Sequence, residues 1–183
     1  MHMPGHKGKN VSNRIFSVYD FDITEIKGAD SLYEAQGMIA ESERNASGLF
    51  GTAATFYSTQ GSTLGIQTML TVAARKGSKV VAPRNSHRAF INTCILLDLE
   101  VEWVIPKGEF NAVSFTYTPD DIEKAVRHAG NPSCVYITSP DYFGRTADIR
   151  GISEVCKKYN IPLLVDNAHG AHLAFFEENI HPI

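Results

Sequence analysis

The residues of this 183-residue sequence that could do chemistry stand in short polar segments, each after an apolar run. Gly61, Ser62 and Thr63 form one such segment, and an apolar stretch with helical spacing follows it. The free N–H groups and partial positive charge of a helix start suit a phosphate, and the two hydroxyls could donate to it. An ordinary helix cap uses the same residue types, so this segment alone leaves both interpretations open.

Two further segments carry ionisable groups. His87 ends a run of polar turn residues, and its flat imidazole could stack on an aromatic ring held by the first segment. A histidine in this position is more often an ordinary polar turn residue without a functional role. Asp166 ends the apolar run 163–165, where a half-buried carboxylate needs a partner. A protonated ring nitrogen, a metal ion or the N–H groups of the next turn could each be that partner.

A metal site is the weaker alternative for the last segment. His169 and His172 follow Asp166 at intervals of three residues, a set that could bind a divalent ion. Histidines on one face of a helix are usually four residues apart, and the glycine between these two indicates a loop. We therefore expect no metal, and a metal-dependent hydrolase stays only as an alternative function.

The segments that must position these residues alternate between apolar runs and helix-like stretches. This order predicts an α/β fold with a mainly parallel sheet and helices on both faces. We expect residues 1–30 to form an amino-terminal arm. The expected strands are 54–57, 79–82, 101–105, 133–138 and 162–165. The expected helices are 31–46, 64–75, 87–97, one opened by 118–121, and 149–159.

The candidate residues all follow expected strands. Ligands of an open parallel sheet bind beyond the carboxyl ends of its strands, so Ser62, His87 and Asp166 should gather at one edge. The acidic Glu123 lies elsewhere, on an expected helix, and is interpreted as a solvated surface residue.

Composition and charge exclude several other classes of function. The chain is 43% hydrophobic, enough for a globular core, and its formal net charge of −3 favours neither nucleic acid nor membrane as a partner. The apolar runs are far shorter than the roughly 18 residues of a membrane span, and the start lacks the apolar core of a signal peptide. Three widely spaced cysteines indicate free thiols in a reducing cytoplasm.

Six motifs in order along the chain resemble the bacterial ornithine/lysine/arginine decarboxylases, which use pyridoxal 5'-phosphate (PLP) on the fold-type-I large domain. The motifs are Asp22–Glu25, Gly28–Leu32, Gln60–Thr63, Arg84–His87, Thr138–Gly144 and Asp166–His172. The resemblance spans essentially the whole chain. It implies that Gly61, Ser62 and Thr63 hold the cofactor phosphate and that His87 stacks on the pyridine ring.

The resemblance also gives roles to the last motif. Asp166 would pair with the ring nitrogen and keep it protonated, and Ala168 would pack on the other face of the ring. His169 would line the pocket near the substrate or the phenolic oxygen, although the family often has tryptophan there. Asp141 stands where threonine is common and Arg88 where lysine is common, which leaves substrate choice open.

The largest departure concerns the lysine that binds the cofactor as a Schiff base. In the family it follows the aspartate motif by several tens of residues, whereas the last lysine here is Lys158. We therefore expect residues 31–183 to be a partial, truncated large domain that lacks the small domain and does not turn over alone.

The implied activity is that of a PLP-dependent carboxy-lyase. Lysine, ornithine or arginine would lose carbon dioxide to give a polyamine-type amine, in a homodimer or higher homo-oligomer in the cytoplasm. Another enzyme of this fold, such as an aminotransferase, a carbon–sulfur lyase or an aldolase, is the first alternative. A non-catalytic remnant that binds PLP or a partner is the second.

Overall fold

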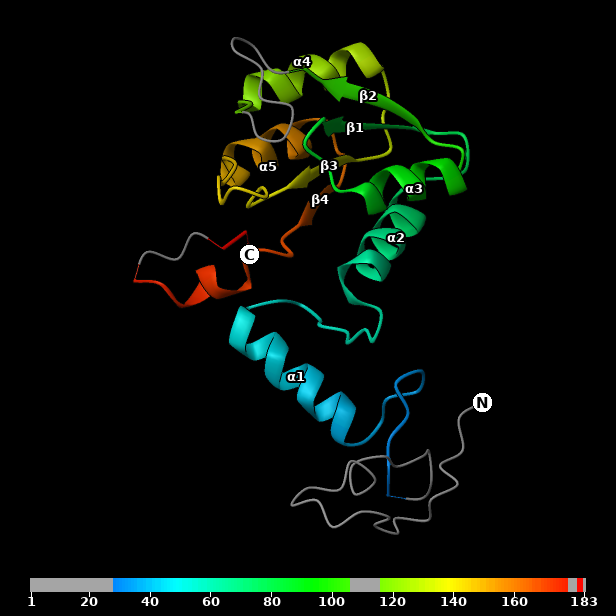
Figure 1. Cartoon of the computed structure of the whole chain (residues 1–183), viewed down its shortest axis with the longest axis vertical. Helices are drawn as coiled ribbons and strands as arrows, with labels where there is room; N and C mark the ends of the chain where they lie inside the picture. Colours follow the sequence, from blue (N-terminus) through cyan, green and yellow to red (C-terminus); the bar gives the residue numbers. More distant parts are fainter. Residues whose placement is uncertain (1–27, 106–115, 178–180, 183) are drawn as a thin grey trace, which may run out of the picture. The chain divides into compact units, whose positions relative to one another are not determined.

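The structure, a computed structural model, describes residues 28–105, 116–177 and 181–182 (Figure 1). The chain forms two compact units, one ending at Tyr57 and one spanning Ser58–Pro182, and each is described by itself. Among the described residues, no helix combines the length and apolar character that a membrane crossing requires. The predicted arm lies almost wholly outside the described ranges.

The first unit contains helix α1 (Met38–Phe50), whose start is held by a distant carboxylate. Asp30 accepts hydrogen bonds from the backbone N–H groups of Gln36, Gly37 and Ile39 at 2.9–3.0 Å. These bonds, that of Gln36 first, lower the pKa of Asp30 to about 2. Asp30 directly precedes the helix predicted for residues 31–46, but it holds the start of α1 across a loop of seven residues, so the predicted helix starts too early.

The strand predicted for residues 54–57 is wrong, because this segment is irregular. The backbone N–H of Tyr57 donates to the carboxylate of Glu43 in α1, at 2.9 Å, and its hydroxyl bonds the hydroxyl of Ser42 at 2.8 Å. Phe56 is 83% exposed. The apolar spacing of this segment therefore does not lead to sheet pairing among the described residues.

The second unit is built on a four-stranded parallel sheet with the order β2-β1-β3-β4 (Figure 1). Its strands are β1 (Lys79–Pro83), β2 (Glu100–Val104), β3 (Val135–Thr138) and β4 (Leu163–Asp166). Each matches a predicted strand to within two residues at either end, which is the usual uncertainty of such boundaries.

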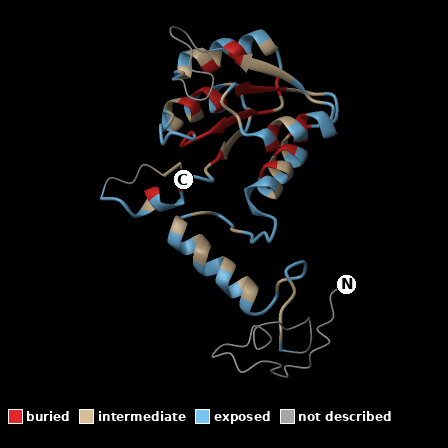
Figure 2. Cartoon of the chain, in the orientation of Figure 1, coloured by how far each residue is buried: buried red, intermediate tan, exposed pale blue. Residues whose placement is uncertain are grey.

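Helices α2 (Gly61–Ala73) and α3 (Arg88–Leu96) cover one face of this sheet. Ile66 of α2 and Phe90 of α3 share one buried cluster with Tyr136 of β3. Figure 2 shows the buried residues concentrated in the inner strands and on the helix sides that face them.

Helices α4 (Pro119–Ala129) and α5 (Ile149–Lys158) cover the other face. Val135 and Ile137 point into this second cluster, whereas Tyr136 between them points into the first. Successive residues of a strand face opposite sides, so a strand buried on both sides must be continuously apolar. The predicted architecture, a parallel sheet with helices on both faces, is confirmed.

Local capping explains where the helices of the second unit begin. Thr118 and Asp121 form a reciprocal capping box at the start of α4, the helix that residues 118–121 were expected to open. The side chains of His87 and Asp148 cap α3 and α5. Helix α2 differs, because its N-cap residue Gln60 makes no capping bond with its side chain.

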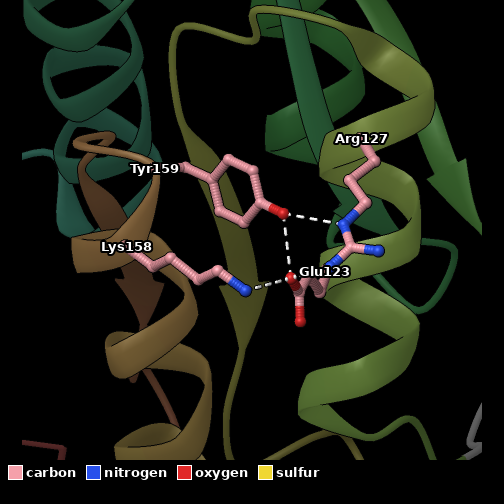
Figure 3. Close-up of polar contacts among 4 residues, drawn as sticks. All are labelled: Glu123, Arg127, Lys158 and Tyr159. Carbon is pink, nitrogen blue, oxygen red and sulfur yellow. Dashed lines mark hydrogen bonds and ion pairs between the residues drawn. The ribbon is translucent and has the colours of Figure 1, made fainter.

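Glu123 on α4 joins α4 to α5 instead of standing free in solvent, which corrects the surface interpretation. Its Oε1 accepts from Nζ of Lys158 at 2.7 Å, from the hydroxyl of Tyr159 at 2.8 Å and from the guanidinium of Arg127 (Figure 3). The hydrogen bond of Lys158, then those of Tyr159 and Arg127, lowers the pKa of Glu123 from 4.5 to about 2.

The order of the strands creates a place for a ligand. Chain order runs from β1 through α3 to β2 on one face, and then through α4 back to β3 on the other. Strands β1 and β3 are neighbours whose following connections leave toward opposite faces. The crevice beyond their carboxyl ends is the usual ligand site of such a sheet.

Candidate functional site

A cavity of about 400 Å³ lies where the strand order predicts it. It brings together six of the seven residues predicted to bind the cofactor. These are Ser62, Thr63, His87, Asp166, Ala168 and His169. Gly61 does not line the cavity, but it begins the helix that presents the next two residues.

The start of α2 is built to receive an anion. No side chain of the described residues caps it, so its first N–H groups are not engaged by a cap, and Ser62 and Thr63 face the cavity. Gly61 has φ +64°, a left-handed conformation that favours glycine. An uncapped helix start with two hydroxyls fits the oxygens of a phosphate.

Two arginines add positive charge to the same cavity. Arg84 and Arg88 line it, and within the described ranges neither makes an ion pair. A guanidinium group can bind a phosphate or a carboxylate through two parallel N–H···O hydrogen bonds. Arg84 received no role from the sequence, and Arg88 only marked a departure from the family. Arg84 lies in the turn after β1 and Arg88 is the first residue of α3, so the two stand on either side of His87, and this position was the signal that could have identified them.

His87 is held in one orientation by the backbone. Its Nδ1 accepts the N–H of Ala89 at 3.1 Å as the N-cap of α3, so the neutral ring carries its proton on Nε2. The ring lines the cavity while this bond fixes its position. Such a fixed imidazole can lie against a flat ligand ring without a further loss of side-chain freedom.

Asp166 is a buried carboxylate, 5% exposed, at the end of β4. Its Oδ2 accepts from the hydroxyl of Tyr136 at 3.1 Å, and its Oδ1 accepts from the N–H of Ala168 at 3.2 Å. No basic side chain of the described residues forms an ion pair with it. A buried carboxylate with only neutral donors still suits a cationic partner, and a protonated ring nitrogen is one.

One buried polar atom of the lining, Oδ1 of Asn85, lacks a hydrogen-bond partner in the described part of the chain. Buried polar atoms are nearly always hydrogen-bonded, so a polar ligand or an ordered water is expected to donate to this oxygen. The donor set of the cavity therefore fits a ligand with a phosphate, a flat ring and polar ring substituents.

The last motif is divided by the structure. His169 lines the cavity and meets the ring of Tyr142 edge-on, with centroids 6.1 Å apart, whereas His172 packs edge-on against Phe176 and is not part of the lining. Among the described residues, no group of three potential ligands is arranged to bind a metal ion. The geometry does not assemble Asp166, His169 and His172 into one cluster.

Asp141 has a structural function that the sequence did not indicate. It is 3% exposed and accepts the N–H groups of Phe143 and Arg145 at 2.9 and 3.0 Å, which shapes the loop after β3. It does not line the 400 Å³ cavity, so its difference from the family is not a direct substrate contact within that cavity.

Known proteins resemble this sequence over nearly its whole length. The profile of the Orn/Lys/Arg decarboxylase major domain matches residues 1–181. Arginine decarboxylase of Bacillus cereus is 32% identical over 184 residues, which cover 97% of this chain and 40% of that protein. Arginine decarboxylase of Bacillus subtilis is 29% identical, over 97% of this chain and 38% of that protein. The chain therefore spans well under half the length of these relatives.

Solved structures share the fold. The complex of SepCysS with the amino-terminal domain of SepCysE gives a TM-score of 0.62 at 15% identity, covering 75% of this chain and 37% of that one. YhfS from Escherichia coli, a PLP-dependent protein, gives a TM-score of 0.56 at 12% identity, covering 70% of this chain and 33% of that one. The likeness confirms the predicted fold-type-I architecture, and PLP is the cofactor of the matched family. By the match of its sequence from residue 1 to residue 181, this chain belongs to the Orn/Lys/Arg decarboxylase family.

Proposed function

We propose that the cavity binds PLP and that the chain contributes this site to a decarboxylase of basic amino acids. The observation that carries the proposal is the meeting, in one cavity, of the uncapped start of α2 with the buried carboxylate of Asp166. The first suits a phosphate and the second a protonated pyridine nitrogen, and PLP has both groups.

Each lining residue then has a task. Ser62 and Thr63 hold the phosphate with their hydroxyls and N–H groups, and Arg84 and Arg88 balance its charge. The imidazole of His87 covers one face of the ring, and the small Ala168 leaves room at the other.

The chemistry at the α-carbon depends on Asp166. This carboxylate holds a proton at the ring nitrogen, because the charged pair is favoured where water is excluded. When bound, the protonated ring supplies a sink for the electron pair that stays on the α-carbon as the carboxyl group of the substrate leaves as carbon dioxide. His169, at the cavity wall, is placed to contact the substrate.

Arginine is the first substrate to test, with lysine and ornithine next. Four of the matched relatives are arginine decarboxylases. In the proposed reaction the bond between the α-carbon and the carboxylate breaks, carbon dioxide leaves, and a proton takes its place. The product is the corresponding amine.

We also propose that these 183 residues alone do not complete the reaction, since no lysine follows Lys158. The purified chain with added PLP should release no carbon dioxide above background from carboxyl-labelled arginine, lysine or ornithine. Steady, enzyme-dependent release from this chain would contradict that part of the proposal.

The assembly is proposed to be a homodimer or higher homo-oligomer working in the cytoplasm. Tyr142, which lines the cavity, and its neighbour Phe143 are 77% and 59% exposed, and a second copy of the chain could cover these two aromatic rings. The three cysteines are free and buried, which suits a reducing compartment. The division into an arm of residues 1–30 and a large domain from residue 31 remains a prediction.

Calorimetric titration with pyridoxamine 5'-phosphate tests the cofactor site. This probe has the phosphate and ring of PLP but no aldehyde that reacts with surface lysines. The natural chain should bind it, and a Ser62→Ala/Thr63→Ala variant should bind at least about 10-fold more weakly, because hydrogen bonds to a charged group are lost. Thr68→Ala, later on the same helix and outside the lining, is the matched control. Equal affinity in all three proteins, or no binding by the natural chain, would refute the assignment.

A further inference from the structure

The phenol of Tyr136 contacts the cavity only through Asp166. Tyr136 is fully buried in β3, does not line the cavity, and donates its hydroxyl proton to Oδ2 of Asp166 in β4 at 3.1 Å. The register pairs Thr138 with Asp166 and Tyr136 with Leu164, so the hydroxyl reaches one pair further along the same face of the sheet.

Two aromatic rings fix this phenol. Phe90 stacks on Tyr136 with centroids 4.3 Å apart and an interplanar angle of 23°, and Trp103 meets Phe90 edge-on at 6.1 Å. The N–H of Phe90 also donates to the carbonyl of His87 at 2.9 Å, so the helix turn that presents the imidazole holds the ring behind the carboxylate. Close-packed aromatic neighbours leave the phenol little freedom to turn away.

The Tyr136 hydroxyl is committed to donation. Burial, and then the charge of Asp166, raise the pKa of Tyr136 far above its usual range, so it keeps its proton. Among the described residues, the Asp166 side chain accepts hydrogen bonds from the hydroxyl of Tyr136, at Oδ2, and from the N–H of Ala168, at Oδ1. Removing the Tyr136 hydroxyl would therefore take away the donor to the buried Oδ2.

We propose that Tyr136 is a positioning residue for the cofactor's ring nitrogen, acting through Asp166. The inference rests on the proposed function. The hydroxyl holds the Asp166 carboxylate so that its remaining lone pairs face the cavity. A carboxylate fixed in this way can accept the N–H of the ring nitrogen without first having to turn.

The inference predicts a difference between two ligands. Pyridoxamine 5'-phosphate has a ring nitrogen that bonds Asp166; its analogue with a C–H in place of that nitrogen does not. The natural chain should prefer the nitrogen-containing ring. Tyr136→Phe keeps the stack on Phe90 and removes one oxygen, and it should weaken binding of pyridoxamine 5'-phosphate about 10-fold, the scale of one hydrogen bond to a charged group. Binding of the carbon analogue should not change.

The experiment is calorimetric titration of both ligands into the natural chain, Tyr136→Phe and Tyr159→Phe, with urea unfolding of each protein to confirm that it is folded. Tyr159→Phe is the matched control, because its hydroxyl also donates to a carboxylate, that of Glu123, outside the cavity lining. It should leave both affinities unchanged.

The outcomes separate the inference from the function beneath it. A Tyr136→Phe protein that loses affinity for both ligands equally, or for neither, overturns the positioning role while the cofactor site stands. A natural chain that binds neither ligand overturns the proposed function and the inference together. In an Asp166→Asn background, Tyr136→Phe should no longer change the preference between the ligands, and a persistent change would show that it acts by another route.

Discussion

The side chain of His87 has two functions at the residue scale. Its Nδ1 caps α3 through the N–H of Ala89, and its ring forms part of the cavity wall. The two functions can be separated because asparagine caps helices well but has no ring.

His87→Asn should leave the free energy of unfolding unchanged, because asparagine also caps a helix. It should weaken binding of pyridoxamine 5'-phosphate about fivefold, the scale of one contact between two rings. His87→Ala should show the same weakening and also lose about 1 kcal/mol in the free energy of unfolding, the scale of a lost N-cap. Urea unfolding and calorimetry measure the two effects. Natural affinity in both variants would remove the stacking role, and natural stability in His87→Ala would remove the capping role.

The sequence could predict His87 and Asp166 as candidates, because each follows a strand and parallel strands end at one edge. Ser62 could be predicted only from the helix start at which it stands, because the strand expected before it does not form. The sequence could not predict the function of Tyr136, since a tyrosine in an apolar strand is typical of a core residue. Its contact with Asp166 depends on the register of β3 and β4, which are far apart in the sequence and pair only in the folded chain.

At the scale of elements, the loop from β4 to the 3₁₀ helix Ala171–Phe175 shapes one wall of the cavity. Gly170 in this loop is buried, and a Cβ there would collide with Oδ1 of Asn167 and approach Cδ of Pro140 to 2.5 Å. The loop can keep its course beside Ala168 and His169 only with glycine at this position.

Gly170→Ala should therefore lower the free energy of unfolding by about 2 kcal/mol, the usual scale of overpacking. It should also weaken binding of pyridoxamine 5'-phosphate. Gly65→Ala is the control: a Cβ there meets nothing within 4 Å, and alanine inside a helix should raise stability by about 1 kcal/mol. Urea unfolding of both proteins checks the pair, and a stable Gly170→Ala protein with natural affinity would contradict it.

The contact between α4 and α5 makes stability depend on pH through Glu123. Its pKa is lowered from 4.5 to about 2, so the ionised side chain stabilises the fold fully above pH 4.5. That contribution is lost as the pH falls from 4.5 toward 2, because the unfolded chain takes up the proton first.

Glu123→Gln should consequently lose less stability between pH 5 and pH 3 than the natural chain, as measured by urea unfolding at both values. Glu154→Gln is the control, because Glu154 pairs with Lys157 inside α5 with both side chains about two-thirds exposed. Such pairs contribute little. If Glu123→Gln and the natural chain lost the same stability, the Glu123 contacts would not hold the two helices together.

Elements with strong local signals could be predicted, and those that depend on distant contacts could not. The capping box of α4 is local, and its helix begins as expected. Helix α1 begins late, because Asp30 reaches it across a loop, and residues 54–57 bind α1 side chains instead of a strand. Neither contact can be predicted from the spacing of the apolar residues.

At the scale of the whole molecule, the cavity lies entirely within the unit Ser58–Pro182. The parallel order of the strands, predicted from continuous apolar runs, brings segments more than 100 residues apart to one crevice. This placement follows from topology alone. The fit of the crevice to one ligand depends on the side chains that line it.

A crystal structure of the chain with pyridoxamine 5'-phosphate tests that fit most directly. The account predicts the phosphate at the start of α2 beside Ser62 and Thr63, the ring against His87, and the ring nitrogen within hydrogen-bond distance of Asp166. A phosphate bound elsewhere, or a ring nitrogen that points away from Asp166, would contradict the assignment of this cavity as the cofactor site.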